Sequence, residues 1–160
     1  MNLGAGNRRI EGYTSVDICR DAEFVADLRE RWPWEDSTVE EVLAYDVFEH
    51  LPDKTHTMNE LWRVLKPGGR AKLQIPHATQ GDGGHCDPTH RSYWTQTDFE
   101  YYEPGYAERE RFRDWDSYPL KADFTIANLD ARGHIPMTRH ERRRGGYVME
   151  MQVLLEAVKK

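Results

Sequence analysis

Residues 41–76 read EVLAYDVFEHLPDKTHTMNELWRVLKPGGRAKLQIP, and this stretch decides the fold. Residues 41–47 are mostly apolar, as expected for a strand that is buried on both faces. Asp53 is a candidate N-cap for a helix that runs to about Lys66, with apolar side chains recurring along one face. Residues 70–76 alternate like a second strand. The order strand, helix, strand with a tight glycine return predicts a βαβ unit in a parallel sheet.

Short strands are also expected ahead of this unit. The first runs into the glycine turn Gly4-Ala5-Gly6, and residues 13–18 and 23–28 form two further β-rich runs. Asp17 and Asp27 stand near the ends of these two runs. Because the carboxyl ends of parallel strands share one edge of a sheet, we expect the glycine turn and the two carboxylates to meet there.

The second half of the chain is less regular. Residues 77–119 are broken by glycines and prolines, with a short helix expected after Thr95, which has a capping-box-like partner in Asp98. Aromatic side chains crowd this segment, and most of them are expected to form a small core beneath it. Residues 123–131 and 147–158 are typical of an antiparallel hairpin that closes the sheet edge.

The composition fits one soluble domain. The 22 Lys and Arg residues against 28 Asp and Glu give a net charge of −6, which argues against a protein that coats nucleic acid. No stretch approaches the ~20 consecutive apolar residues of a membrane span, and the start of the sequence has no secretion signal. We therefore expect a single cytoplasmic domain over residues 1–160 with an insertion at about 77–119, and no membrane partner.

An arginine-rich run at residues 139–144 is the exception to the acidic character. Such a run is most often a solvated loop, but it can also grip a phosphate or an acidic substrate. It keeps a nucleotide acceptor open as an alternative.

The glycine turn and the carboxylates favour a nucleoside-type cofactor. A carboxylate at the end of the second strand can accept hydrogen bonds from both hydroxyls of a ribose. A dinucleotide site needs a helix directly after the glycine turn, and residues 7–12 are too few to form one before the next strand.

Several motifs in one register resemble a known family. They are Leu3-Gly4-Ala5-Gly6, Val16-Asp17-Ile18, Ala26-Asp27-Leu28, Phe48-Glu49-His50-Leu51 and Arg63-Val64-Leu65-Lys66-Pro67-Gly68-Gly69. Over residues 2–78 the sequence is similar to the class I S-adenosylmethionine-dependent methyltransferases, in a compact form of the methyltransferase type 11 branch. The implied fold class is α/β, a Rossmann-like, mostly parallel sheet with the C-terminal antiparallel hairpin added.

The resemblance implies S-adenosylmethionine as the cofactor and assigns a set of residues to it. In the family, the glycine turn packs against the methionine part, the end of the second strand holds the ribose, and the end of the third flanks the adenine. The carboxylate after the fourth strand lies near the methionine ammonium. The residues at those places are, in that order, Gly4, Ala5 and Gly6; Asp17 and Ile18; Asp27 and Leu28; and Asp46.

The sequence departs from the family pattern at its start. Family members carry a helix before the first strand that helps to cover the cofactor, whereas this sequence starts at the strand and lacks that N-terminal helix. We expect the cover to come from residues 77–119 or from a second subunit, as in a homodimer.

Histidines are the candidates for acceptor chemistry. Methyl transfer is an in-line displacement, and a hydroxyl acceptor often needs a general base, for which histidine suits neutral pH. His77, His85 and His90 follow the fifth strand and are our candidate catalytic residues, while His50 is expected to play a supporting part. With Asp87 they could instead bind zinc or iron, but loop spacing does not show that they converge, so no metal site is predicted.

Together these observations predict methyl transfer from S-adenosylmethionine to a small-molecule acceptor, with a sugar or other hydroxyl favoured and a histidine as base. Nucleic acid is a disfavoured acceptor because the chain is acidic. Two alternatives stay open: a nucleotide or nucleic-acid methyltransferase, and a non-catalytic methyltransferase-like partner subunit.

Overall fold

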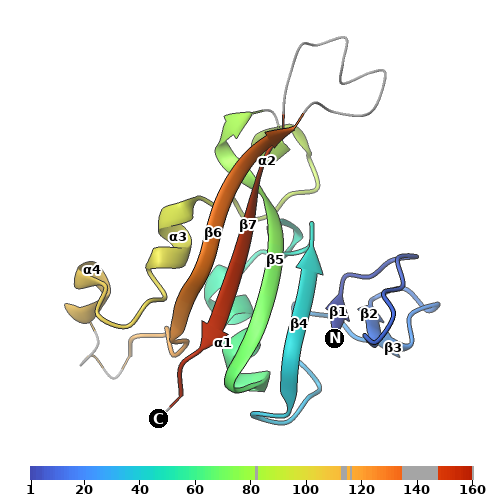
Figure 1. Cartoon of the computed structure of the whole chain (residues 1–160), viewed down its shortest axis with the longest axis horizontal. Coiled ribbons are helices and arrows are strands. Elements are labelled where there is room, and N and C mark those ends of the chain that lie inside the picture. Colours follow the sequence, from blue (N-terminus) through green and yellow to red (C-terminus); the bar gives the residue numbers. More distant parts are fainter. Residues whose placement is uncertain (82, 113–114, 116, 135–147, 160) are drawn as a thin grey trace.

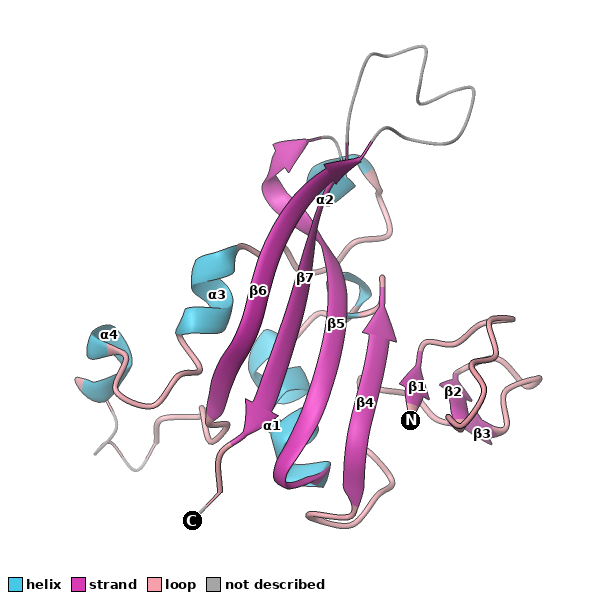
Figure 2. Cartoon of the chain, viewed as in Figure 1, coloured by secondary structure: helices cyan, strands magenta, loops and turns pink. Residues whose placement is uncertain are grey.

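The computed structural model describes residues 1–160 except 82, 113–114, 116, 135–147 and 160. Its described part contains a seven-stranded sheet in the order β3-β2-β1-β4-β5-β7-β6 (Figures 1 and 2). The strands are β1 (Asn2–Leu3), β2 (Ser15–Asp17), β3 (Phe24–Val25), β4 (Val39–Tyr45), β5 (Leu65–Gly81), β6 (Phe124–His134) and β7 (Val148–Ala157). The helices are the 3-10 turn η1 (Phe48–His50), α1 (Lys54–Val64), α2 (Gly83–Cys86), α3 (Gln96–Glu100) and α4 (Ala107–Glu110).

The sheet is mostly parallel, which confirms the Rossmann-like prediction. Strands β1 to β5 pair in parallel, and β7 runs antiparallel to both β5 and β6. The chain builds outward from β1 to β3 and then crosses to β4 on the other side of β1. Such a reversal opens a crevice at the carboxyl ends of the flanking strands, where open α/β sheets bind their ligands.

Helix α1 begins as the sequence predicts. The Asp53 side chain accepts a hydrogen bond from the backbone N–H of His56 at 2.9 Å, and this bond caps the first turn. Met58 and Leu61 are fully buried in the core. The helix ends at Val64, slightly earlier than expected, because Leu65 is already extended and pairs with Val39 at the start of β5.

The strands differ from prediction mainly in length. Strand β5 extends beyond the expected 70–76 at both ends, where Leu65 pairs with Val39 of β4 and Gly81 pairs with Val148 of β7. Strand β1 is short, as expected, while β2 and β3 have three and two residues and are shorter than the expected runs 13–18 and 23–28. Their carboxyl ends lie at the same edge of the sheet, and the chain leaves the sheet after each of them.

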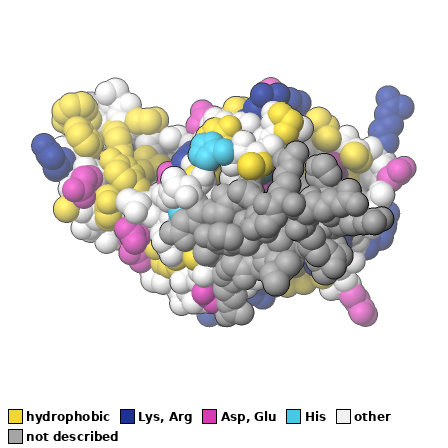
Figure 3. Space-filling model, turned by 90° about the horizontal axis from the view of Figure 1, so that it is seen from above, with side chains coloured by type: hydrophobic (Ala, Val, Ile, Leu, Met, Phe, Trp, Pro, Cys, Tyr) yellow, Lys and Arg dark blue, Asp and Glu magenta, His cyan; other side chains and the backbone are white. Residues whose placement is uncertain are grey.

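The insertion after β5 contains helices and an aromatic core. The capping box between Thr95 and Asp98 is present at the start of α3, as predicted. Trp94 is fully buried and stacks on Phe99 with 5.2 Å between the ring centroids. Trp115 is an exception with 60% exposure, and apolar side chains gather on the end of the molecule that carries α3 and α4 (Figure 3).

The arginine-rich run at residues 139–144 lies outside the described residues. Among the described helices, none combines the length and the apolar character that crossing a membrane requires.

Candidate functional site

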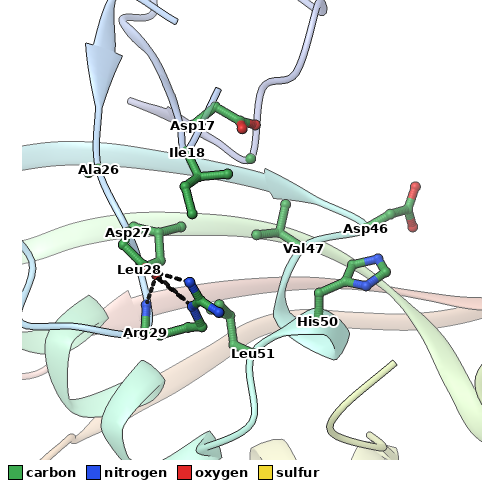
Figure 4. A pocket seen from close by; sticks show the side chains of 11 residues that line it. Asp17, Ile18, Ala26, Asp27, Leu28, Arg29, Asp46, Val47, His50 and Leu51 are labelled. Atoms are coloured by element: carbon green, nitrogen blue, oxygen red, sulfur yellow. Dashed lines mark hydrogen bonds and ion pairs between the residues drawn. The ribbon is translucent and has the colours of Figure 1, made fainter. Parts of the chain in front are cut away.

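A cavity of about 390 Å³ opens at the crevice between β1 and β4, within the usual size range of small-molecule sites. It is lined by Gly4, Asp17, Ile18, Ala26, Asp27, Leu28, Arg29, Asp46, Val47, His50 and Leu51 (Figure 4). The wall therefore comes from the segments that follow β1, β2, β3 and β4. Six residues of the predicted cofactor set lie in it: Gly4, Asp17, Ile18, Asp27, Leu28 and Asp46.

The glycine turn after β1 permits a close approach of two backbone segments. Gly4 has φ +59°, and a Cβ atom at this position would lie 2.3 Å from Cγ2 of Val47. Only glycine fits here, because both the backbone conformation and the space exclude a side chain. Ala5 and Gly6 belong to the same turn but are not among the residues that line the cavity.

Asp17 is held in place by the backbone around it. Its Oδ2 accepts from the N–H of Gly6 at 2.8 Å and its Oδ1 accepts from the N–H of Cys19 at 2.9 Å. Burial opposes ionisation of Asp17, but these backbone hydrogen bonds outweigh it and hold its pKa below the ordinary value. Each oxygen keeps a further lone pair, so the carboxylate can also accept hydrogen bonds from a ligand.

Asp27 is fixed by an arginine that the sequence analysis missed. The Arg29 guanidinium donates to both carboxylate oxygens of Asp27, with NH2 to Oδ2 at 2.5 Å. These hydrogen bonds lower the pKa of Asp27 to about 2. The signal was the Asp-Leu-Arg spacing, since an Asp side chain commonly accepts from the backbone N–H two residues on, as Asp27 does from Arg29 at 3.0 Å.

The opposite end of the cavity is formed by the turn after β4. Asp46 has φ +57°, which is uncommon outside glycine, and Nε2 of Gln74 donates to its Oδ2 at 3.2 Å. Figure 4 shows Asp46 and His50 at one end of the cavity, away from Asp27 and Arg29. Val47 and Leu51 supply apolar surface between the charged groups.

The four histidines named in the sequence analysis differ in their relation to the cavity. His50 lines the cavity, whereas His77, His85 and His90 do not. His77 is only 3% exposed, and burial lowers its pKa. His85 stacks on Tyr93 with 4.2 Å between the ring centroids. His90 is the one next to the cavity wall, because its ring lies 4.9 Å from the ring of His50.

The metal ligands considered from the sequence do not form one group either. Among the described residues, the His, Cys, Asp and Glu side chains close enough to share an ion are Glu49, His50 and His90, whose ligand atoms all lie within 4.8 Å of one another. His77 and His85 are outside this group, and the spacing along the loop gave no sign of Glu49.

Comparisons with known proteins agree with the geometry. A family model described as a methyltransferase domain matches residues 9–73. A SAM-dependent methyltransferase from Methanosarcina mazei superposes with a TM-score of 0.64 at 15% identity, covering 99% of this chain and 92% of that one. The YcgJ protein from Bacillus subtilis superposes with a TM-score of 0.61 at 12% identity, covering 99% and 91%.

A third similar structure is a complex. It contains the Haloferax volcanii Trm112 methyltransferase activator and a protein described as a methyltransferase, with a TM-score of 0.56 at 19% identity, covering 95% of this chain and 80% of that one. At these identities the superpositions establish the fold, and the family match adds the domain type over residues 9–73.

Proposed function

We propose that this chain, a methyltransferase domain with the class I methyltransferase fold, binds S-adenosylmethionine in the 390 Å³ cavity and transfers its methyl group to a hydroxyl of a small molecule. One observation carries the proposal: the glycine turn after β1 and the carboxylates after β2, β3 and β4 all line the same cavity. A nucleoside with an amino-acid tail offers hydroxyl, base and ammonium groups to match them.

The order of these residues along the cavity sets the direction of the cofactor. Asp17 accepts hydrogen bonds from the ribose hydroxyls, and Asp27 and Leu28 flank the adenine at the end that carries Arg29. The glycine turn and Asp46 hold the amino-acid part at the other end, where the Asp46 carboxylate attracts the ammonium. The transferable methyl then faces the side of the cavity to which His50 belongs.

The reaction that follows is a displacement at carbon. S-adenosylmethionine supplies a methyl group on a sulfonium, so an acceptor oxygen forms the new O–CH3 bond as the C–S bond breaks, leaving neutral S-adenosylhomocysteine. The proton of the acceptor hydroxyl passes to a histidine base. Of the three predicted catalytic histidines, we assign the role of base to His90, because its ring lies beside that of His50 at the cavity. The chain's main contribution is alignment and exclusion of water.

A small acceptor is favoured by charge. The net charge of −6 repels a polyphosphate, and Asp17, Asp27 and Asp46 add negative charge at the cavity itself. A neutral hydroxyl compound approaches this surface without that penalty.

A methyl-transfer assay tests the proposal. The purified protein is incubated with methyl-labelled S-adenosylmethionine and separate panels of sugars, phenols and nucleosides, and label in the acceptor is counted. We expect transfer to a hydroxyl compound by the wild type and a large loss in Asp17→Ala. Transfer that is equal in Asp17→Ala and the wild type would contradict the assigned cavity.

A partner subunit is a second candidate function, and the sheet edge favours it. Strand β3 lies at the edge of the sheet, with Phe24 38% and Val25 53% exposed, and Ile18 is 59% exposed nearby. Edge strands with exposed apolar side chains are open to pairing with another chain. The similar Haloferax protein is bound to an activator. Light scattering of the purified chain distinguishes a monomer, a homodimer and a chain that aggregates without a partner.

A further inference from the structure

One carboxylate oxygen of Glu49 is buried without a hydrogen-bond partner among the described residues. The residue is only 2% exposed, and its Oε2 atom is fully enclosed with no hydrogen-bond partner among the described residues. A buried carboxylate that lacks a partner costs free energy, so native proteins protonate such groups, pair them or use them to bind cations. This carboxyl is not needed for the cofactor contacts described above.

Two histidines face the same point. The ligand atoms of Glu49, His50 and His90 lie within 4.8 Å of one another. Around one metal ion with bonds of ~2.0–2.2 Å, ligand atoms lie about 3–4 Å apart, so a small contraction completes the site. The side chain of His90 is 7% exposed, whereas His50 is exposed and also lines the cavity.

The hydrogen bonds of His90 leave one ring nitrogen available. Its Nδ1 lies 2.8 Å from the carbonyl oxygen of Gly84, which can only accept, so Nδ1 carries the proton and Nε2 holds a lone pair. A backbone carbonyl on the far nitrogen is the arrangement that orients a metal-binding histidine. The Nε2 atom lies 3.9 Å from Oδ2 of Asp87.

The backbone ties together the two segments that carry these side chains. The carbonyl oxygen of Glu49 accepts from the N–H of Arg91 at 2.7 Å and from the N–H of Ser92 at 2.9 Å. The Ser92 hydroxyl also donates to the carbonyl oxygen of Phe48 at 2.9 Å. The relative positions of η1 and the 87–92 segment are therefore fixed before any ion binds, as a preorganised site requires.

The surroundings are negatively charged, which suits a cation. Asp46, Asp87 and Glu150 lie close enough for their negative charges to act on the Glu49 carboxyl group. A divalent ion would relieve both the burial and the repulsion.

We propose that Glu49, His50 and His90 bind a divalent transition-metal ion beside the cavity, at the end that His50 lines. Two imidazoles and one carboxylate suit Zn²⁺, Fe²⁺, Mn²⁺ or Co²⁺ better than Mg²⁺ or Ca²⁺. The part concerning the acceptor rests on the proposed function: the ion would bind the hydroxyl oxygen and lower its pKa, so that the hydroxyl proton can pass to solvent water. The ion would then activate the hydroxyl in place of His90, because Nε2 of His90 holds the ion and cannot accept the proton.

Titration of the metal-free protein with Co²⁺ tests the site without any turnover. The chelator-treated chain is followed by the visible absorption of bound Co²⁺, and Zn²⁺ is then added to displace it. We expect one equivalent to bind, and at least ~10-fold weaker binding in both Glu49→Gln and His90→Gln, since even outer-shell changes cost that much.

His56→Gln is the matched control. His56 lies on α1, where its Nε2 is 3.0 Å from the carbonyl oxygen of Glu30, and it is not part of the cluster. Equal weakening in His56→Gln, or no Co²⁺ binding by the folded wild type, would overturn the proposal. If Glu49→Gln does not fold, as judged by circular dichroism, His90→Gln and His50→Gln decide.

Binding of S-adenosylhomocysteine in the same samples separates the two proposals. Metal binding without nucleoside binding would support the metal site and contradict the proposed function. Nucleoside binding without metal binding would contradict the metal site and support the proposed function.

Discussion

The carboxylates at one end of the cavity and the carboxylate beside its other end have opposite hydrogen-bonding surroundings. At the end that we propose for adenosine, Asp17 and Asp27 have lowered pKa values and accept hydrogen bonds from backbone N–H groups and the Arg29 guanidinium. Beside the end that we propose for the acceptor, Glu49 is buried next to two histidines, and no described residue donates a hydrogen bond to its Oε2. Carboxylates that are already held by donors stay ionised and can accept further hydrogen bonds from ligand hydroxyls. A buried carboxylate oxygen without a donor is stabilised by a cation or by protonation.

The origin of this difference lies in the segments that follow the strands. The short strands β2 and β3 end at the sheet edge, so the turns that follow offer free N–H groups to the carboxylates after them. Strand β4 is longer and runs into η1, which turns Glu49 inward beneath the 87–92 segment. Asp46, which directly follows β4, is exposed, so the η1 turn buries the carboxyl group of Glu49 and the strand does not.

Removal of Asp17 should break the adenosine end most severely. Asp17→Ala loses the acceptor of both ribose hydroxyls, and hydrogen bonds to a charged group contribute ~1.5–3 kcal/mol each before compensation by water. We expect affinity for S-adenosylhomocysteine to fall by about 100-fold, equivalent to ~3 kcal/mol. Calorimetry measures it, with the exposed neighbour Asp21→Ala as the control. An unchanged dissociation constant in folded Asp17→Ala would remove Asp17 from the site.

The pH dependence of stability should have opposite signs at the two ends. Because folding raises the pKa of Glu49 to about 8, its stabilising contribution is complete below the ordinary value of 4.5 and is lost as pH rises through about 8. Asp17 and Asp27, whose pKa values are lowered, stabilise above their ordinary values and lose this effect in acid.

Thermal unfolding of the metal-free protein measures the Glu49 effect. Between pH 5 and pH 8.5 we expect Tm to fall in the wild type and to fall by less in Glu49→Gln, with about 2–4 °C for each kcal/mol. Identical pH profiles for the two proteins would show that Glu49 is not a buried, unpaired carboxyl.

Removal of Arg29 should give the smallest effect. Arg29→Ala leaves Asp27 in place but frees its carboxylate to rotate, and exposed ion pairs contribute little. We expect a ~2–5-fold weaker affinity for S-adenosylhomocysteine, about 0.5–1 kcal/mol. Arg20→Ala, an exposed arginine outside the cavity, serves as the control in the same titration. A loss as large as that of Asp17→Ala would mean that Arg29 contacts the ligand itself.

Much of the fold and of the adenosine end could be predicted from the sequence, because both depend on local signals. The cap at Asp53, the capping box at Thr95 and the glycine turn act within a few residues of themselves. The sheet edge then brings Asp17 and Asp27 together as a consequence of parallel pairing.

The acceptor end could not be predicted because it depends on contacts between distant segments. Glu49 meets His90 through hydrogen bonds from Arg91 and Ser92 to its own carbonyl oxygen, across some forty residues of chain. Histidine spacing within residues 77–90 carries no information about that contact. The length of β5 was missed for a similar reason, since its end is set by pairing with β7.

Calorimetric titration of the purified chain with S-adenosylhomocysteine tests the central claim most directly. We predict saturable binding at one site, abolished or strongly weakened by Asp17→Ala and preserved in Asp21→Ala. No heat of binding from a wild-type sample that circular dichroism shows to be folded would contradict the assignment of the cavity to the nucleoside cofactor.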